Sequence, residues 1–71
     1  MCLSSVYAVK DGEKELLCKN IASVKNENGK LVFIDIMGIQ TVFEGSIEHI
    51  DLMDNFIYVR RSSMIEALAN A

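Results

Sequence analysis

The stretch VYAVKDGEKELLC, residues 6–18, places the pair Asp11-Gly12 between two apolar runs. A two-residue hairpin turn requires positive φ at both central residues, and Asp-Gly and Asn-Gly pairs adopt it readily. The later stretch IASVKNENGKLVFIDI repeats the pattern around Asn28-Gly29. The two stretches therefore predict two successive β-hairpins.

The rest of the chain continues this pattern of short strands separated by turns. A third turn is predicted at Met37-Gly38, a strand break at Gly45, and a further turn at Asp54-Asn55. The predicted strands cover residues 3–10, 13–18, 21–26, 30–36, 39–44 and 56–60. With no proline and frequent turns, the sequence predicts an all-β fold, a small antiparallel meander that closes into an SH3-like or similar barrel or a sandwich.

The chain is expected to form one small β domain over residues 1–60, followed by a different C-terminal segment. In residues 61–71, RSSMIEALANA, Ser63 and Glu66 have the spacing of a helix capping box. One face of that helix would carry Ile65, Leu68 and Ala69. We expect a short C-terminal helix that is either docked or frayed, because two or three turns alone are marginal in water.

Charge disfavours nucleic acid as a partner. The 71 residues carry 7 Lys and Arg against 10 Asp and Glu, a net charge of −3. Binding several phosphates requires a positive field, whereas the longest basic block here is Arg60-Arg61. The sequence also presents no evident aromatic stacking pair on a basic strand.

Hydropathy and cysteine content indicate the compartment. No apolar run approaches the roughly twenty residues that cross a bilayer, so no membrane association is expected. The N-terminus lacks the basic region and long apolar run of a secretory signal. We therefore expect a cytoplasmic protein with its two cysteines reduced.

Two predicted strands are apolar on both faces, namely LVFI at 31–34 and FIYV at 56–59. A strand with two apolar faces needs cover on both. The cover on the outer face is most simply a second copy of the chain, which predicts a homodimer with two-fold symmetry. The alternative is that both runs form the two-sided core of a very small barrel.

The sequence does not indicate an enzyme, since no known catalytic or phosphate-binding motif occurs. His49, within IEHID, is interpreted as a surface residue, and Cys18 as a small buried hydrophobic residue. A solvated acidic rim is expected from Glu44, Glu48, Asp51 and Asp54.

Cys2 is different, because it lies beside the N-terminal amine. If Met1 is retained, its α-amine, the deprotonated amide nitrogen of Cys2 and the Cys2 thiolate can chelate one metal ion in a plane. Such planar nitrogen and sulfur donors suit Ni(II) or Cu(II). If Met1 is removed, Cys2 still offers an amine and a thiolate, and in either case a second chain's Cys2 can fill an open position.

The start MCLSSVY and the stretch NENGKLVFIDIMGIQTVFEGSIEHIDLMDNFIYV resemble the CooT family of small nickel-binding proteins over roughly residues 1–59. The resemblance implies a homodimeric β domain that binds Ni(II) near its N-termini and assists nickel delivery to carbon monoxide dehydrogenase. Among the residues of this chain, the resemblance assigns a role as metal ligand only to Cys2. Similar proteins have also been labelled as RNA-binding.

These observations predict a non-enzymatic, homodimeric accessory protein that binds Ni(II) through Met1 and Cys2 and has a nickel enzyme as its client. The alternative is a metal-free small barrel that binds protein or RNA. The two hypotheses differ in whether Cys2 and nickel affect the oligomeric state.

Overall fold

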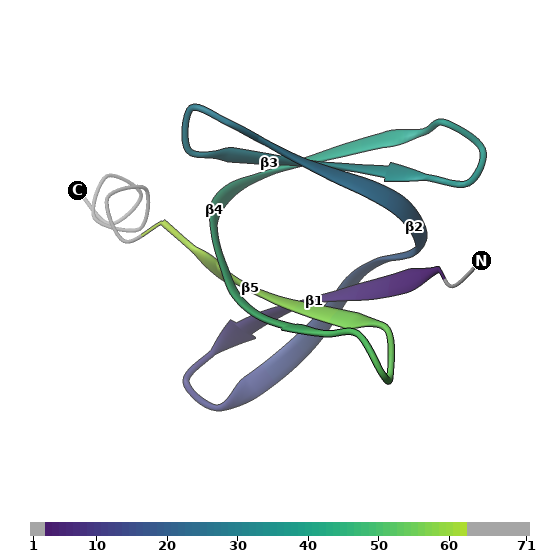
Figure 1. Ribbon diagram of the computed structural model, residues 1–71. Coiled ribbons are helices and arrows are strands. Elements are labelled where there is room, and N and C mark those ends of the chain that lie inside the picture. Colours follow the sequence, from purple (N-terminus) through teal and green to yellow (C-terminus); the bar gives the residue numbers. More distant parts are fainter. Residues whose placement is uncertain (1–2, 63–71) are drawn as a thin grey trace.

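The computed structural model describes residues 3–62, and every regular element in this range is a β-strand (Figure 1). The strands are β1 (Ser4–Lys10), β2 (Glu13–Glu27), β3 (Lys30–Asp35), β4 (Gln40–Asp51) and β5 (Phe56–Arg61). The all-β prediction is confirmed. The helix predicted from Ser63 onward lies outside the described residues.

Both predicted hairpin turns are confirmed. Asp11 and Gly12 have φ of 51° and 80°, and Asn28 and Gly29 have φ of 52° and 81°. Positive φ at both central residues is the conformation that matches the right-handed twist of the flanking strands. These turns set the order of β1, β2 and β3.

The prediction of two separate strands over 13–18 and 21–26 is wrong, because β2 is continuous. Its first part pairs with β1 as far as Ile21, and its second part pairs with β3 from Ile21 onward. Asn20 has φ of 62°, and the register shifts on both sides of it. The strand therefore bends at Asn20 where a break was expected.

The predicted break at Gly45 is also wrong, since β4 runs through it. A Cβ atom at Gly45 would overlap the carbonyl oxygen of Arg60 and lie 2.6 Å from the Phe43 ring. Glycine inside a strand often marks such a close approach of another backbone. Gly45 is therefore needed for packing.

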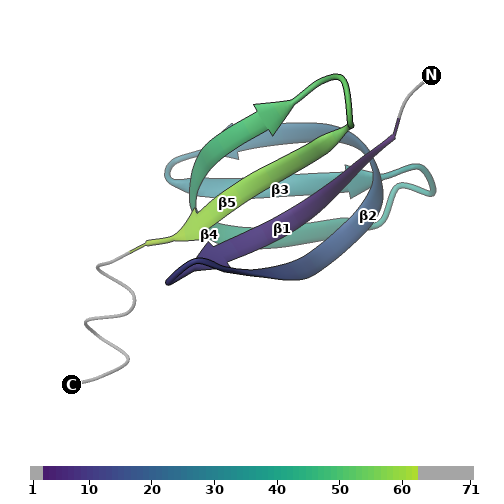
Figure 2. The same cartoon turned by 90° about the horizontal axis from the view of Figure 1, so that it is seen from below.

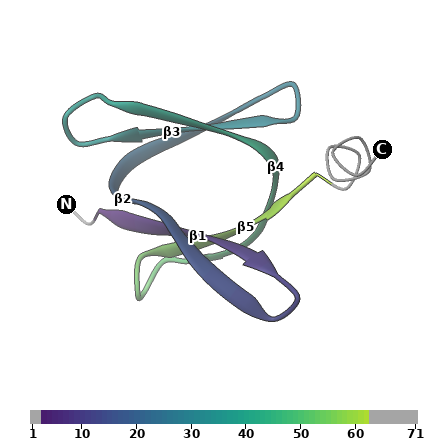
Figure 3. The same ribbon diagram turned by 180° about the vertical axis from the view of Figure 1, so that it is seen from behind.

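The five strands follow one another around a closed ring, in the order β1-β2-β3-β4-β5 (Figures 1 and 3). Neighbours along the chain are antiparallel, whereas the closing pair of β1 and β5 is parallel. The predicted antiparallel meander is therefore confirmed, and the prediction did not specify the parallel pair that closes the ring. This pair is parallel because the first and fifth strands of a meander run in the same direction.

The core fills the inside of the ring with apolar side chains of all five strands. Its buried members are Val6, Ile21, Leu31, Phe33, Phe43, Ile57 and Val59. The runs LVFI (31–34) and FIYV (56–59), which are apolar on both strand faces, each have residues that lie outside this core. Val32 is nevertheless only 8% exposed, and Phe56 and Tyr58 are half-buried. One copy of the chain therefore supplies part of the cover that the sequence analysis assigned to a second copy.

The two ends of the ring differ in which segments they carry. At one end lie the start of β1, the β3–β4 turn (36–39) and the β4–β5 turn (52–55) (Figures 1 and 2). We call it the chain-start end. The two hairpin turns and the end of β5 lie at the opposite end (Figure 3).

Candidate functional site

The predicted ligands Met1 and Cys2 lie outside the described residues, which begin with the half-buried Leu3. The position of the following residues is fixed by both neighbouring strands. Ser4 pairs with Ile21 of β2, and the Ser5 N–H donates to the Asn55 carbonyl oxygen at 3.0 Å. The chain therefore enters β1 at a defined place between β2 and the β4–β5 turn.

The β3–β4 turn beside this entry is organised by Asp35. Its Oδ1 accepts the backbone N–H groups of Met37 and Ile39, both at 2.9 Å. The Gly38 N–H donates to the Asp35 carbonyl oxygen at 2.9 Å, and Gly38 has φ of 85°. An aspartate that satisfies turn N–H groups in this way holds the backbone in one conformation.

The β4–β5 turn has the same construction. Oδ1 of Asp51 accepts the N–H groups of Met53 and Asp54 at 2.9 and 2.8 Å. Both turns therefore begin with an aspartate that is followed by an aliphatic residue and a methionine. Each carboxylate therefore holds the backbone of its own turn.

Both turns expose apolar side chains to solvent. The exposed fractions are 63% for Ile36, 82% for Met37, 61% for Ile39, 83% for Leu52 and 92% for Met53. We call these five residues the turn-tip residues. Apolar side chains that gather on one surface commonly mark an interaction site. The sequence analysis placed turns here but did not recognise the repeated aspartate, aliphatic and methionine pattern.

Cys18, which was predicted to be buried, is half-buried and packs against the core. Burial raises the pKa of its thiol, a hydrogen bond with Thr41 lowers it, and the charge of Asp35 raises it again. The net pKa is above the ordinary value. The protonated thiol is therefore favoured, and a protonated thiol is a poor metal ligand.

His49 is confirmed as an exposed residue on β4. Its ring centroid lies 6.0 Å from that of Phe56 and 6.1 Å from that of Tyr58. Within residues 3–62, no three His, Cys, Asp or Glu side chains converge in a way that could hold a metal ion. The described part of one chain therefore provides no metal site away from the N-terminus.

The expectation that no aromatic pair stacks on a basic strand is wrong. Phe56 and Tyr58 stack with centroids 4.5 Å apart on β5, which ends in two arginines. Tyr7 packs edge-on against Tyr58 at 5.9 Å, and Lys14 Nζ lies 4.6 Å from the Tyr58 centroid. The alternation in FIYV could have revealed this pair, because residues two apart share a strand face.

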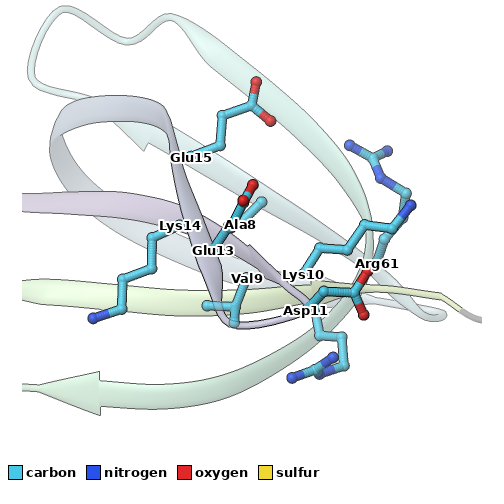
Figure 4. A pocket seen from close by; sticks show the side chains of 9 residues that line it. Ala8, Val9, Lys10, Asp11, Glu13, Lys14, Glu15 and Arg61 are labelled. Carbon is cyan, nitrogen blue, oxygen red and sulfur yellow. The ribbon is translucent and has the colours of Figure 1, made fainter.

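A hollow of about 770 Å³ lies at the opposite end, between the β1–β2 hairpin and the end of β5 (Figure 4). Its charged lining consists of Lys10, Lys14, Arg60 and Arg61 together with Asp11, Glu13 and Glu15. Charges of both signs alternate there, so the hollow does not present a field of one sign. It is separated from the chain-start end by the length of the strands.

The described part of the chain has no helix able to span a membrane.

Comparison with known proteins adds two positive findings and one negative one. A crystal structure of "putative CooT" from Carboxydothermus hydrogenoformans is similar, with a TM-score of 0.80 and 23% sequence identity over 86% of this chain and 98% of that chain. At this identity the likeness shows the fold. Comparison with curated proteins gives no match.

The second finding concerns the sequence itself. The family model described as "CO dehydrogenase accessory protein CooT" matches residues 1–60, which include Cys2 and all but the last residue of β5. The match covers far more than half of the 71 residues. The chain therefore belongs to the CooT family.

Proposed function

We propose that the protein is a non-enzymatic accessory protein that captures Ni(II) and delivers it to a nickel enzyme such as carbon monoxide dehydrogenase. The observation that carries this proposal is the family match, which begins at residue 1 and so includes Met1 and Cys2. The family is described as accessory to CO dehydrogenase. In this proposal, nickel is the cargo of the protein.

The donors at the N-terminus suit this cargo. The Met1 α-amine, the deprotonated Cys2 amide nitrogen and the Cys2 thiolate form two adjacent five-membered chelate rings in one plane. Mixed nitrogen and sulfur donors in a plane favour Ni(II) or Cu(II) over tetrahedral zinc. The amide and the thiol must lose their protons, so nickel affinity should fall as the pH is lowered.

The proposed site is shared by two copies of the chain. Three donors from one N-terminus leave a position open, and residues 3–62 contain no group of three or more His, Cys, Asp or Glu side chains that could hold the metal ion instead. Asp35 and Asp51, the carboxylates of the two adjacent turns, already accept two backbone N–H groups each. Cys2 of a second copy can supply the missing thiolate, which would make the protein a homodimer with one Ni(II).

The two cysteines provide a matched test. We expect Cys2→Ser to weaken nickel binding in a calorimetric titration by well over tenfold and to remove the thiolate-to-nickel absorption. Cys18→Ser should leave both unchanged, because Cys18 packs against the core. Native mass spectrometry with and without Ni(II) should show one metal ion per dimer. Unchanged nickel affinity in Cys2→Ser would contradict the proposal.

A second candidate function is binding of single-stranded RNA without metal. The observation that favours it is the stacked pair of Phe56 and Tyr58 beside Lys14, because stacked aromatic side chains with nearby cations are typical of such surfaces. A titration with an RNA oligonucleotide at increasing salt tests it. Binding through phosphates should weaken steeply with salt and be lost in Tyr58→Ala.

A further inference from the structure

Within residues 3–62, four residues other than glycine have positive φ. Asp11 and Asn28 belong to the two-residue hairpin turns, in which positive φ is part of the turn type. Asn20, with φ of 62°, lies inside β2, and Asn55, with φ of 58°, directly precedes β5. This conformation is unfavourable for residues other than glycine, although asparagine tolerates it better than most. Backbone conformations of this kind are concentrated at functional sites.

Asn55 holds the start of β1 from the side of β5. Its carbonyl oxygen accepts the Ser5 N–H at 3.0 Å, and the next residue, Phe56, pairs with Ser5. The turn before Asn55 is itself held by Asp51, whose Oδ1 accepts two backbone N–H groups. The positive φ of Asn55 directs the chain from this turn into β5, so the position of the carbonyl oxygen that binds Ser5 depends on it.

Asn20 holds the start of β1 from the side of β2. It directly precedes Ile21, which is buried in the core and pairs with both Ser4 of β1 and Asp35 of β3. The register shifts next to each of these pairs, so the bend at Asn20 allows one residue to serve two neighbouring strands. Such irregularities are common at the rims of barrels and beside active sites.

These two contacts determine where the first residues leave the ring. Ser4 and Ser5 are paired with the neighbouring strands, and Leu3 is half-buried. Cys2 is two residues before Ser4, and two residues of extended chain span at most about 7 Å. In the proposed function, Met1 and Cys2 bind nickel and Cys2 of a second copy completes the site. Donors that are held close to their bound positions lose less conformational entropy when they bind.

From these observations we infer that Asn20 and Asn55 are positioning residues for nickel capture. Their left-handed backbone conformation holds the start of β1, and thereby the ligands Met1 and Cys2, where two copies of the chain can share one metal ion. Neither asparagine is a ligand. This inference rests on the proposed function, because it names the residues that position the donors of the same site.

The test compares alanine with glycine at the two positions in the full chain. Alanine disfavours positive φ, whereas glycine adopts it readily. Asn20→Ala and Asn55→Ala, alone and combined, are therefore compared with Asn20→Gly and Asn55→Gly. The matched control is Asn28→Ala, because Asn28 has φ of 52° but lies in a hairpin turn at the opposite end of the ring (Figure 3).

Four quantities are measured on each variant. Calorimetric titration gives the nickel affinity, and circular dichroism of the thiolate-to-nickel bands reports the geometry of the bound metal ion. Thermal unfolding gives the stability, and hydrogen exchange of the Ser5 amide in the metal-free chain reports how firmly the start of β1 is held. The spectrum and the Ser5 exchange rate separate positioning from a general loss of stability.

We expect the combined alanine variant to bind nickel at least about tenfold more weakly, as loss of groups that orient metal ligands does, with an altered dichroism spectrum. Each single alanine variant should show part of this effect, and the Ser5 amide should exchange faster in Asn55→Ala. The glycine variants should keep an affinity and a spectrum close to those of the parent chain. Asn28→Ala should lower the melting temperature and leave nickel affinity unchanged.

Two results would overturn the inference. One is an affinity and a spectrum like those of the parent chain in folded alanine variants at positions 20 and 55. The other is an equal loss of nickel affinity in Asn28→Ala, which would attribute the effect to stability alone. If the combined variant does not fold, the two single variants decide in its place. Failure of the proposed function is read separately from Cys2→Ser, whose unchanged nickel affinity would contradict capture through Cys2 whatever the asparagine variants show.

Discussion

Asp35 and Met37 are joined by a hydrogen bond of 2.9 Å, in which the Met37 backbone N–H donates to the Asp35 carboxylate. The same oxygen accepts the Ile39 N–H. Removing the carboxylate leaves both N–H groups without this partner, and a hydrogen bond to a charged group contributes about 1.5–3 kcal/mol. We therefore expect Asp35→Ala to lower the free energy of unfolding by roughly that amount in urea denaturation.

Asp54→Ala serves as the control for this change. Asp54 lies in the other turn and is exposed, and within residues 3–62 its carboxylate accepts none of the turn N–H groups. The control should stay within about 0.5 kcal/mol of the parent chain. Equal stability of the two variants would show that the Asp35 carboxylate does not hold its turn.

Gly45→Ala should destabilise the fold through overpacking. The added methyl group would overlap the Arg60 carbonyl oxygen and press on the buried Phe43 ring. Adding a methyl group to a packed site typically costs about 1–3 kcal/mol. Thermal unfolding measures the effect, with Ser46→Ala at the next, exposed position as the control. A melting temperature equal to that of the control would contradict the close approach of β4 and β5.

The Cys18 thiol should titrate above the ordinary thiol range. Burial, the largest influence, raises its pKa, so the folded chain holds this proton more tightly than the unfolded chain. Stability from this group is complete below the unfolded pKa and is lost as the pH rises toward the folded pKa. In a Cys2→Ser background, the alkylation rate plotted against pH should have a higher midpoint in the folded protein than in urea. Coincident midpoints would refute this expectation.

An N-terminal extension should impair nickel capture, which follows from the proposed ligand set. Placing Gly-Ser before Met1 converts the α-amine into an amide and leaves the Cys2 thiolate in place. We expect nickel affinity to fall at least about tenfold, or 1.4 kcal/mol, in a calorimetric titration. The same dipeptide appended after Ala71 is the control. Equal nickel affinity of the two extended chains would remove the amine from the ligand set.

Local turn chemistry made the hairpins predictable from the sequence. Asp11-Gly12 and Asn28-Gly29 adopt positive φ as the residue types require. Asn20 and Gly45 misled the prediction, because an asparagine with positive φ can bend a strand as well as end it, and a glycine can mark a close approach as well as a break. Which of these occurs depends on residues distant in sequence, such as Arg60 beside Gly45.

The candidate site was predictable only in part. Cys2 can be recognised as a candidate ligand from the sequence alone, because it lies next to the residue that carries the N-terminal amine. The turn-tip residues could not be grouped from the sequence, since Met37 and Met53 come to the same end only after the ring has closed. The stack of Phe56 on Tyr58 likewise depends on strand geometry, because the same residues in a helix would point in different directions.

The odd number of strands has a consequence for how the molecule can be handled. In a ring of four or six antiparallel strands, the last strand would end where the first begins. With five strands, β5 ends away from Ser4, and the Ser62 N–H is bonded to the Glu44 carbonyl oxygen at the opposite end (Figure 3). A surface anchor attached at Ser62 would therefore place the start of β1 at the end of the ring away from the support.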